Sequence, residues 1–264
     1  MTVAEALSLA GHRLSAAGVD TPTVDAEWLV AHALGVSRSD LRLERQREVP
    51  ESFVALLERR ELREPLAYVL GEWGFRRLTL KTDARALIPR PETEIVVERA
   101  LALIGEFDEP RVLDIGVGSG AMALAIADEH PGAHVTGVDT SPAALELARE
   151  NAATLGYEVE LRSGGSETAA EGWDLVVSNP PYVPQAALPL LQPELRWEPR
   201  DAVVEAALHE EIARAARTRR LVLEVGDGQA GEVAALLEAH AYTAITITPD
   251  LAGVERVVEG TGDF

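Results

Sequence analysis

Two short runs hold the residues whose types and spacing can do chemistry. The first is Asp114-Ile115-Gly116-Val117-Gly118-Ser119-Gly120, which is predicted to end a strand and to begin a helix. Glycines permit a tight turn and let a ligand touch the backbone, while a helix N-terminus presents free N–H groups. Asp139, at the end of the next predicted strand, is placed to hold a ribose. The run predicts a nucleotide-type site, and because 116–121 also fits G-x-G-x-x-G/A, a dinucleotide remains an alternative.

The second run is Ser178-Asn179-Pro180-Pro181-Tyr182, which directly follows another predicted strand. Its two prolines fix the backbone and carry no N–H, so the local carbonyls remain as acceptors. A group carrying an NH2 can donate one hydrogen to the Asn179 side-chain oxygen and another to the Pro180 carbonyl, while the Tyr182 ring packs on its planar part. We expect this pocket to turn the lone pair of that nitrogen towards an electrophile held at the glycine loop.

The combination of the two runs resembles a class I S-adenosylmethionine (SAM)-dependent methyltransferase that acts on an amino or amide nitrogen. A hydride-transfer enzyme has no need for a planar NH2 pocket, so the pair of runs favours SAM over a dinucleotide. The resemblance implies that SAM lies by the glycine loop with its ribose on Asp139, and that S-adenosyl-L-homocysteine is the product. Catalysis is then expected to rest on positioning, with an in-line methyl transfer and carbonyl dipoles that oppose the charge developing on nitrogen.

The elements that must position these runs follow an alternating pattern after Pro91. We expect helices at 92–104, 119–129, 141–155, 204–217 and 229–240, and strands at 111–115, 134–138, 158–162, 173–177, 220–225, 243–248 and 254–259. Such alternation predicts an α/β fold, Rossmann-like, with a mostly parallel sheet covered by helices on both faces. The last two strands are joined without a helix, which predicts an antiparallel hairpin at that edge.

The sequence before Pro91 has a different pattern. Apolar residues at helical spacing over the first 70 positions predict a small N-terminal helical bundle, and the alternating segment 75–82 predicts a β-hairpin. We therefore expect a helical domain at 1–70, a hairpin linker at 71–90 and a SAM-dependent methyltransferase domain at 91–264.

Three further stretches narrow the resemblance to one family. They are Ile88-Pro89-Arg90-Pro91-Glu92-Thr93-Glu94, Leu223-Glu224-Val225-Gly226 with Gln229, and Asp250-Leu251-Ala252-Gly253 leading to Arg256-Val257-Val258. With the two runs above, they resemble the HemK/PrmC family over the whole chain. Its members methylate the glutamine side-chain amide in the Gly-Gly-Gln motif of peptide chain release factors. The resemblance implies that a release factor is the protein substrate and that the helical domain 1–70 helps to grip it.

The same resemblance implies which residues form the site. The cofactor-binding residues would be Asp114, Gly116, Val117, Gly118, Ser119, Gly120, Asp139 and Asn179. The catalytic residues would be Asn179, Pro180 and Tyr182, and the substrate-binding residues Asn179, Pro180, Pro181 and Tyr182.

The chain departs from the family pattern in three places. Ser163-Gly164-Gly165-Ser166 stands where the family often has an aspartate and a bulky aromatic that pack near the adenine. Val203–Leu208 replaces the usual glycine-rich stretch of the loop after the proline-rich run, and Gly253-Val254-Glu255 stands where a basic residue is common.

The charge of the chain bears on its partners. The sequence holds 24 lysines and arginines against 44 acidic residues, a formal net charge of −20, and 31 of the acidic residues but only 12 basic ones lie in 86–264. A polyanion would be repelled by that part of the chain, so no stable nucleic-acid binding is expected.

The alternative to a release-factor methyltransferase is a methyltransferase for an exocyclic amine of a DNA or RNA base, since a flipped base fits the same pocket. A non-catalytic scaffold that senses SAM is a third hypothesis, against which the intact proline-rich run argues.

Composition excludes other classes of chemistry. The chain has no cysteine, which excludes disulfides, thiolate metal sites and a cysteine nucleophile, and its 6 histidines lack ligand spacing, so no metal site is expected. No apolar run reaches the ~18 residues of a membrane helix. The first ten residues include Glu5 and no basic cluster before an apolar stretch, unlike a secretory signal. We therefore expect no membrane association and a cytoplasmic location.

Overall fold

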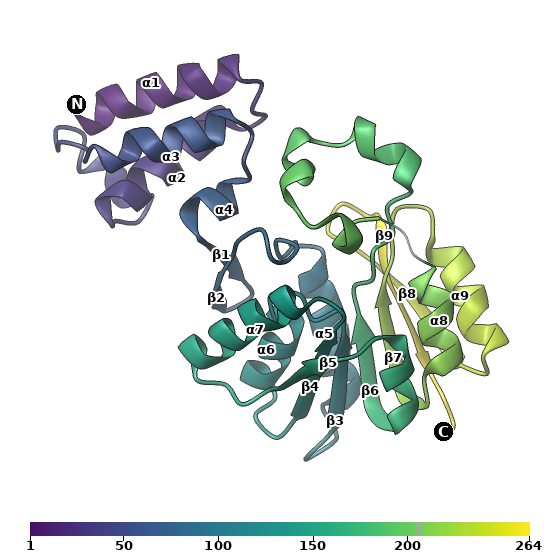
Figure 1. Cartoon of the computed structure of the whole chain (residues 1–264). Helices are drawn as coiled ribbons and strands as arrows, with labels where there is room; N and C mark the ends of the chain where they lie inside the picture. The colour runs from purple at the N-terminus through teal and green to yellow at the C-terminus, as the bar shows by residue number, and fades with distance from the viewer. Residues whose placement is uncertain (205–206) are drawn as a thin grey trace. The chain divides into compact units, whose positions relative to one another are not determined.

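The computed structural model describes residues 1–204 and 207–264, which divide into two compact units (Figure 1). The first unit is formed by 1–72 together with 192–197, and the second by 73–191 and 198–264. The segment 192–197 lies within the loop that follows the proline-rich run. One loop of the chain therefore contributes residues to both units.

The first unit is helical. Its helices are α1 (Val3–Ala16), α2 (Pro22–Leu34), α3 (Ser52–Glu61) and α4 (Leu66–Leu70), with a 3-10 turn η1 (Asp40–Arg42). A capping box begins α1, because the Thr2 hydroxyl accepts from the backbone N–H of Glu5 while the Glu5 carboxylate accepts from that of Thr2. Apolar side chains at helical spacing, among them Leu14, Leu29 and Leu57, are fully buried between the helices. The prediction of N-terminal helices is confirmed.

Four charged side chains fasten the segment 192–197 to α2 and α3 within this unit. Arg63 donates to both carboxylate oxygens of Glu194, at 2.7 and 2.8 Å. Arg60 lies 2.8 Å from the same carboxylate and donates to Asp25 Oδ2 at 2.7 Å. We call Asp25, Arg60, Arg63 and Glu194 the charged cluster. Two cations and two anions balance each other there, which is the condition under which buried charges are tolerated.

The hairpin at the start of the second unit is attached to the glycine loop through one asparagine. Its strands are β1 (Glu72–Phe75) and β2 (Leu78–Lys81). The Asn151 side chain of helix α7 (Pro142–Leu155) accepts from the backbone N–H of Lys81 at 2.8 Å and donates to the carbonyls of Lys81 and Ser119, at 3.1 and 2.9 Å. Since Asn151 is buried, these bonds fix β2 beside the start of helix α6 (Ala121–Glu129).

The second unit is built on a twisted sheet with strand order β5-β4-β3-β6-β7-β9-β8. Its strands are β3 (Arg111–Ile115), β4 (His134–Asp139), β5 (Glu160–Ser163), β6 (Trp173–Ser178), β7 (Thr218–Glu224), β8 (Thr243–Pro249) and β9 (Glu255–Thr261). The pairs from β5 to β7 are parallel, whereas β9 pairs antiparallel with both β7 and β8. The predicted mostly parallel sheet with an antiparallel hairpin at one edge is confirmed.

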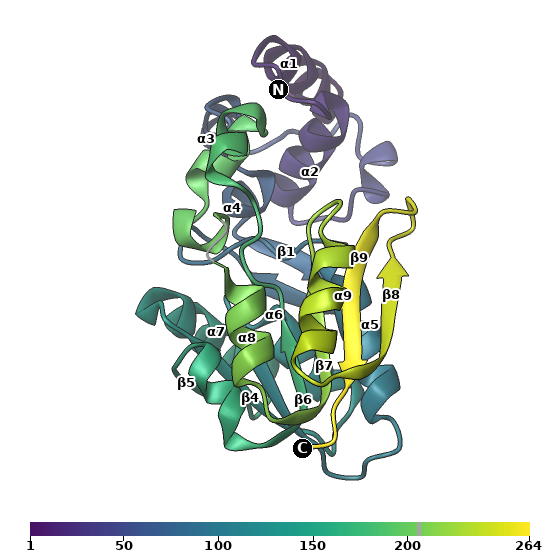
Figure 2. The same cartoon turned by 90° about the vertical axis from the view of Figure 1, so that its right-hand side faces the viewer.

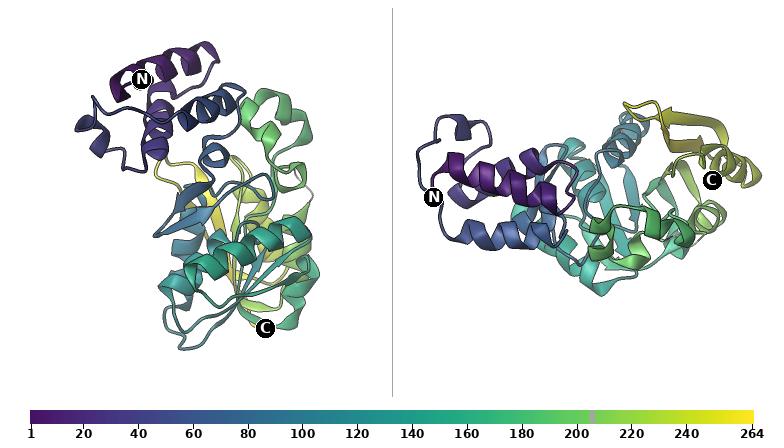
Figure 3. Two further views of the ribbon diagram at one scale, coloured as in Figure 1. Left: turned by 60° about the vertical axis from the view of Figure 1, so that its left-hand side comes forward. Right: turned by 90° about the horizontal axis from the view of Figure 1, so that it is seen from above.

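Helices cover both faces of this sheet, as the views in Figures 2 and 3 show. They are α5 (Thr93–Ile104), α6 (Ala121–Glu129), α7 (Pro142–Leu155), α8 (Leu208–Ala215) and α9 (Ala230–Ala239). Neighbouring residues of one strand join different cores: Val177 packs in the cluster that contains α5, α6 and α7, and Val176 in the one that contains α8 and α9. Buried on both faces, the parallel strands read as continuous apolar runs.

The helix predicted at 204–217 is shorter than expected. Its predicted residues 205–206 lie outside the described part of the chain, and α8 begins only at Leu208. Val204 instead forms a β-bridge with Val183, and Ala207 has a left-handed backbone with φ +54° just before the helix. After Ala215 the chain becomes extended and enters β7 at Thr218. The pairing of Val204 with Val183 therefore prevents the helix from starting at the position that its apolar periodicity predicts.

No helix among residues 1–204 and 207–264 combines the length and the apolar character needed to cross a membrane.

Candidate active site

Three neighbouring parallel strands end at the same level and place the predicted motifs together. Ile115 of β3 pairs with Val138 of β4 on one side and with Ser178 of β6 on the other. The residues that follow these three are Gly116, Asp139 and Asn179. The Ser178 hydroxyl also donates to the Ile115 carbonyl at 2.8 Å, which ties β6 to β3 at this point. Ligands of open α/β sheets bind outside the carboxyl ends of the strands, so this edge is the expected place for a site.

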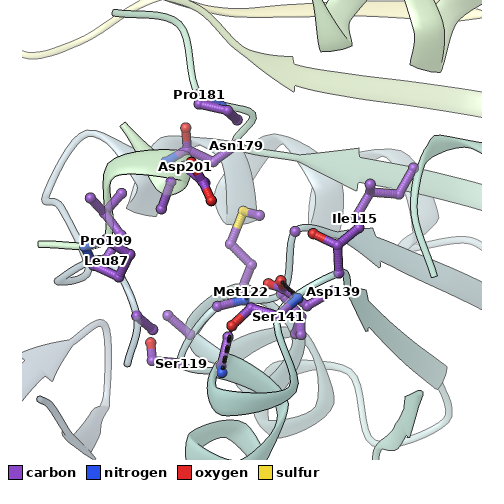
Figure 4. Close-up of a pocket in the computed structure, with 18 of the residues that line it drawn as sticks. Leu87, Ile115, Ser119, Met122, Asp139, Ser141, Asn179, Pro181, Pro199 and Asp201 are labelled. Atoms are coloured by element: carbon purple, nitrogen blue, oxygen red, sulfur yellow. Dashed lines mark hydrogen bonds between the residues drawn. The ribbon is translucent and has the colours of Figure 1, made fainter. Parts of the chain in front are cut away.

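A cavity of about 430 Å³ lies at this edge, in the size range of small-molecule sites (Figure 4). Its lining includes Gly116, Asp139 and Asn179. The other lining residues are Arg85, Ala86, Leu87, Ile88, Pro89, Arg90, Thr93, Ile115, Val117, Gly118, Ser119, Ala121, Met122, Thr140, Ser141, Ala144, Gly164, Gly165, Ser166, Pro181, Pro199, Asp201, Ala202 and Leu208. The cavity is thus walled by the glycine loop, by the segment before α5 and by the loop after the proline-rich run.

The glycine loop has the backbone that a close ligand requires. The N–H groups of Gly116 and Val117 both donate to the Val138 carbonyl, at 2.8 and 2.9 Å, which bends the chain sharply after β3. Gly116 has φ +75°, and a Cβ atom there would meet no protein atom within 4 Å. A side chain would therefore be strained, and it would occupy space at the cavity wall. This cradle fits the backbone approach of a nucleotide-type ligand at the start of α6.

Asp139 is held by two backbone N–H groups at the edge of the cavity. Its Oδ2 accepts from Gly118 at 3.0 Å, and its Oδ1 accepts from Ser141 at 2.8 Å. Each carboxylate oxygen can accept more than one hydrogen bond, so both remain able to accept from a vicinal diol. Figure 4 shows Asp139 and Ser141 together at the cavity, close to the glycine loop. This pair of acceptor oxygens fits the two ribose hydroxyls of SAM.

Asp114 lies beneath the loop rather than in the wall of the cavity. It is fully buried, and its Oδ2 accepts from the backbone N–H of Ala123 at 3.1 Å, at the start of α6. Its Oδ1 has no hydrogen-bond partner among the described residues. Burial raises the pKa of Asp114 to about 7, against the lowering effect of the Ala123 hydrogen bond and with the nearby Asp139 charge raising it further. Asp114 supports the turn from below.

The proline-rich run places its residues at different depths. Asn179 and Pro181 line the cavity, whereas Pro180 is buried and the Tyr182 hydroxyl donates to Glu224 Oε1 at 3.1 Å. Burial and the neighbouring Glu224 charge raise the pKa of Tyr182. Asn179 Nδ2 donates to Thr93 Oγ1 at 3.0 Å, and its Oδ1 accepts no hydrogen bond from the described residues. Asn179 therefore presents a free acceptor.

The structure brings in residues to which the sequence reasoning gave no role. Glu198 accepts from the backbone N–H of Ile88 at 3.0 Å and from Arg90, so it fixes the segment that walls the cavity before α5. Thr93 and Glu224 stand behind the proline-rich run. Thr93 and Glu224 lie in the stretches that carry the family resemblance, but their partners are 86 and 131 positions away along the chain. Only the folded sheet shows what they contact.

No group of three or more histidine or acidic side chains among residues 1–204 and 207–264 is arranged to hold a metal ion.

Comparison with solved structures shows the fold. The fold is similar to the hMettl16 catalytic domain in complex with MAT2A 3′UTR hairpin 6, with a TM-score of 0.55, 13% identity, and coverage of 69% of this chain and 74% of that one. It is also similar to the T. thermophilus 16S rRNA N2 G1207 methyltransferase (RsmC) in complex with AdoMet and guanosine, with a TM-score of 0.54, 19% identity, and coverage of 72% and 49%. Residues 96–191 match the methyltransferase small domain family. The fold and the site define a class I SAM-dependent methyltransferase.

Sequence relatives identify the family within that class. Residues 5–71 match the PrmC N-terminal domain. The chain is 40% identical to the release factor glutamine methyltransferase of Deinococcus radiodurans over 98% of both chains. It is 37% identical to that of Caulobacter vibrioides over 98% of this chain and 96% of the relative. The chain belongs to the release factor glutamine methyltransferase family.

Proposed function

We propose that this enzyme transfers a methyl group from SAM to the side-chain amide nitrogen of the glutamine in the Gly-Gly-Gln motif of a peptide chain release factor. The observation that carries the proposal is the acceptor presented by Asn179 at the carboxyl end of β6, beside the glycine loop. The near full-length similarity to proteins named for this activity supports it.

Some of the proposed cofactor-binding residues would contact SAM, and Asp114 would support the loop that does so. Bound SAM supplies a methyl group on a sulfonium, an electrophile that needs no metal. The glycine loop and Asp139 would hold it, with Asp114 stabilising the loop from beneath. The proposed cofactor-binding residues are Asp114, Gly116, Val117, Gly118, Ser119, Gly120, Asp139 and Asn179.

The proposed substrate residues orient a weak nucleophile. An amide nitrogen has its lone pair delocalised into the carbonyl, so its orientation decides whether it can attack. Asn179 Oδ1 and the Pro180 carbonyl would each accept one amide hydrogen, and Pro181 and the Tyr182 ring would contact the planar group. The fixed dipoles oppose the positive charge that develops on nitrogen, and they cost no reorganisation at the moment of transfer.

The proposed partner is a protein, not a nucleic acid. A formal net charge of −20 repels a polyanion and removes the non-specific attraction on which nucleic-acid enzymes depend. The helical domain 1–70 would contribute to binding the release factor, which remains a prediction.

Label transfer tests the proposal. Radiolabelled SAM is incubated with the enzyme and a purified release factor, its Gly-Gly-Gln→Gly-Gly-Ala variant, total tRNA, rRNA or DNA. We expect label only on the wild-type factor. Label on a nucleic acid would instead support the base-amine alternative, and bound SAM with no label on any acceptor would support a SAM-sensing scaffold.

A further inference from the structure

A chain of hydrogen bonds links the buried carboxylate of Glu224 to the amide of Asn179. Glu224 ends β7, where the preceding Leu223 pairs with Ser178, so the register of the sheet brings Glu224 level with Asn179, which directly follows the neighbouring strand β6. Thr93, the first residue of α5, stands between them. Its hydroxyl donates to Glu224 Oε2 at 2.7 Å and accepts from Asn179 Nδ2 at 3.0 Å. Thr93 is 5% exposed and Glu224 is 0% exposed.

The ionised carboxylate sets the direction of these hydrogen bonds. A carboxylate only accepts, and a hydroxyl has a single hydrogen to donate. Because the hydrogen of Thr93 points to Glu224, Thr93 Oγ1 can only accept from Asn179. The Asn179 nitrogen must therefore face Thr93, which leaves its carbonyl oxygen as the acceptor for a ligand. The orientation of the Asn179 side-chain amide is thus fixed by the Glu224 carboxylate, two hydrogen bonds away.

The same carboxylate also holds Tyr182. The Tyr182 hydroxyl donates to Glu224 Oε1 at 3.1 Å, and the Gln229 side chain donates to the Tyr182 carbonyl at 3.1 Å. The two oxygens of Glu224 therefore hold two residues of the proline-rich run: Tyr182 directly, and Asn179 through Thr93.

We propose that Glu224 is a positioning residue that sets, through Thr93, which end of the Asn179 amide faces the substrate. The functional meaning rests on the proposed function. A glutamine NH2 can donate only to the oxygen of Asn179, and a reversed Asn179 amide would place donor against donor. Reversal would both remove a hydrogen bond to the substrate and repel its amide, so the nitrogen lone pair would no longer be aimed.

Protonation of Glu224 is expected to leave the orientation of the Asn179 amide no longer fixed. Burial raises the pKa of Glu224 to about 7, while hydrogen bonds from Thr93 and Tyr182 act to lower it. Among nearby charges, Glu92 raises that pKa and Arg256 on β9 lowers it. On the α8 side, His209 Nε2 lies 2.8 Å from the backbone carbonyl of Glu224.

The sign of the pH effect follows from the direction of the shift. Above about pH 7 the group is a carboxylate and Thr93 must donate to it. Below that pH the carboxyl carries a hydrogen that can be donated to Thr93, whose own hydrogen is then free to point at Asn179. We therefore expect kcat to fall as the pH drops through about 7.

Four variants of the full chain separate positioning from general structural damage. Thr93→Val removes the hydroxyl at similar volume, Thr93→Ser keeps it, and Glu224→Gln replaces an acceptor oxygen by a donor. Glu259→Gln is the matched control, because Glu259 is a buried carboxylate of β9 that pairs with Arg99 outside the site. We expect Thr93→Val and Glu224→Gln to lower kcat by about tenfold to a hundredfold with unchanged SAM affinity. Thr93→Ser and Glu259→Gln should retain kcat, and kcat of Glu224→Gln should no longer change with pH near 7.

A second readout needs no acceptor protein. In the SAM-bound enzyme, the side-chain NH2 resonances of Asn179, assigned by their loss in Asn179→Ala, should shift with a midpoint near pH 7 in the wild type and not in Glu224→Gln. Wild-type kcat in Thr93→Val, or Asn179 resonances that do not respond to pH, would overturn the inference. If no release factor is methylated while these resonances behave as expected, the proposed function fails and the control of the Asn179 amide stands.

Discussion

At the residue scale, two side chains would have separate roles: Asp139 at the end of β4 and Asn179 just after β6, on either side of β3. Asp139 is held by backbone N–H groups of the glycine loop and of the turn before α7, so its environment belongs to the cofactor side of the cavity. Asn179 is held by Thr93 and borders both sides of the cavity, but the oxygen that it leaves free is the acceptor assigned to the substrate amide. Substitution of one residue should therefore change a different measured quantity from substitution of the other.

Asn179→Ala should lower kcat by about a hundredfold or more, because it removes a positioned acceptor for the substrate amide. SAM affinity should change little. Single-turnover methyl transfer and calorimetric titration of SAM give the two quantities separately. Equal losses in kcat and in SAM affinity would contradict the role assigned to Asn179.

Asp139→Ala should mainly weaken SAM binding, because it removes the carboxylate that faces the cavity beside the glycine loop. Calorimetric titration measures the change. Asp174→Ala is a matched control, since that carboxylate accepts from the backbone of Arg111 near the opposite end of the strands. Unchanged SAM affinity in Asp139→Ala would exclude the ribose contact.

At the scale of elements, the positions of the two motifs follow from strand order and register. The glycine loop and the proline-rich run are about 60 residues apart in sequence, yet β3 and β6 are neighbours and end together. The apolar runs that precede each motif predicted a strand before each one, but they did not predict the order of the strands. The sequence did not predict the bonds of Thr93 and Glu224, because pairing between distant polar side chains leaves no periodic signal. It also misplaced the start of α8, where the bridge between Val183 and Val204 competes with the helix.

The charged cluster gives a stability prediction for the helical unit. Glu194→Ala would leave Arg63 without its bidentate partner, and removal of one member of a buried ion pair costs about 3 kcal/mol. Hydrogen exchange of backbone amides in α2 and α3 should report this loss. Glu27→Ala breaks a more exposed pair with Arg38 and should cost less than about 1 kcal/mol. Equal protection in the two variants would show that the cluster does not hold the segment 192–197.

The same cluster should make the helical unit sensitive to acid. Burial acts to raise the pKa of Glu194, but hydrogen bonds from Arg63 and Arg60 hold it below its ordinary value. A lowered pKa contributes stability that is present above the ordinary pKa and is lost as the pH falls. Protection of α2 and α3 should therefore decrease with acid in the wild type, and less so in Glu194→Ala.

At the scale of the whole molecule, the negative net charge and the family membership both favour a protein over a nucleic acid as the substrate. The excess of acidic residues in 86–264 was evident from the sequence, and the full-length relatives are named for a protein substrate. The family resemblance could be found from the sequence because its motifs are contiguous runs. The cavity wall could not be predicted from the sequence, because it combines three segments that only the fold brings together. They are the segment before α5, the glycine loop and the loop after β6.

Nucleic acid should therefore compete poorly with the protein substrate. We expect tRNA, rRNA and DNA to leave the rate of release-factor methylation unchanged at low ionic strength, where electrostatic attraction to a basic protein would be strongest. Initial rates with and without each nucleic acid measure this. Inhibition that weakens steeply with added salt would reveal a polyanion-binding surface.

The position of the transferred methyl group is the most direct measurement. A release factor would be incubated with the enzyme and SAM, digested, and examined by tandem mass spectrometry. The geometry of Asn179 and Pro180 predicts one added methyl on the side-chain nitrogen of the glutamine in the Gly-Gly-Gln peptide, formed more slowly by about a hundredfold or more when Asn179→Ala replaces the wild type. A methyl group on another residue, or an unmodified peptide under conditions in which SAM is bound, would contradict the proposed function.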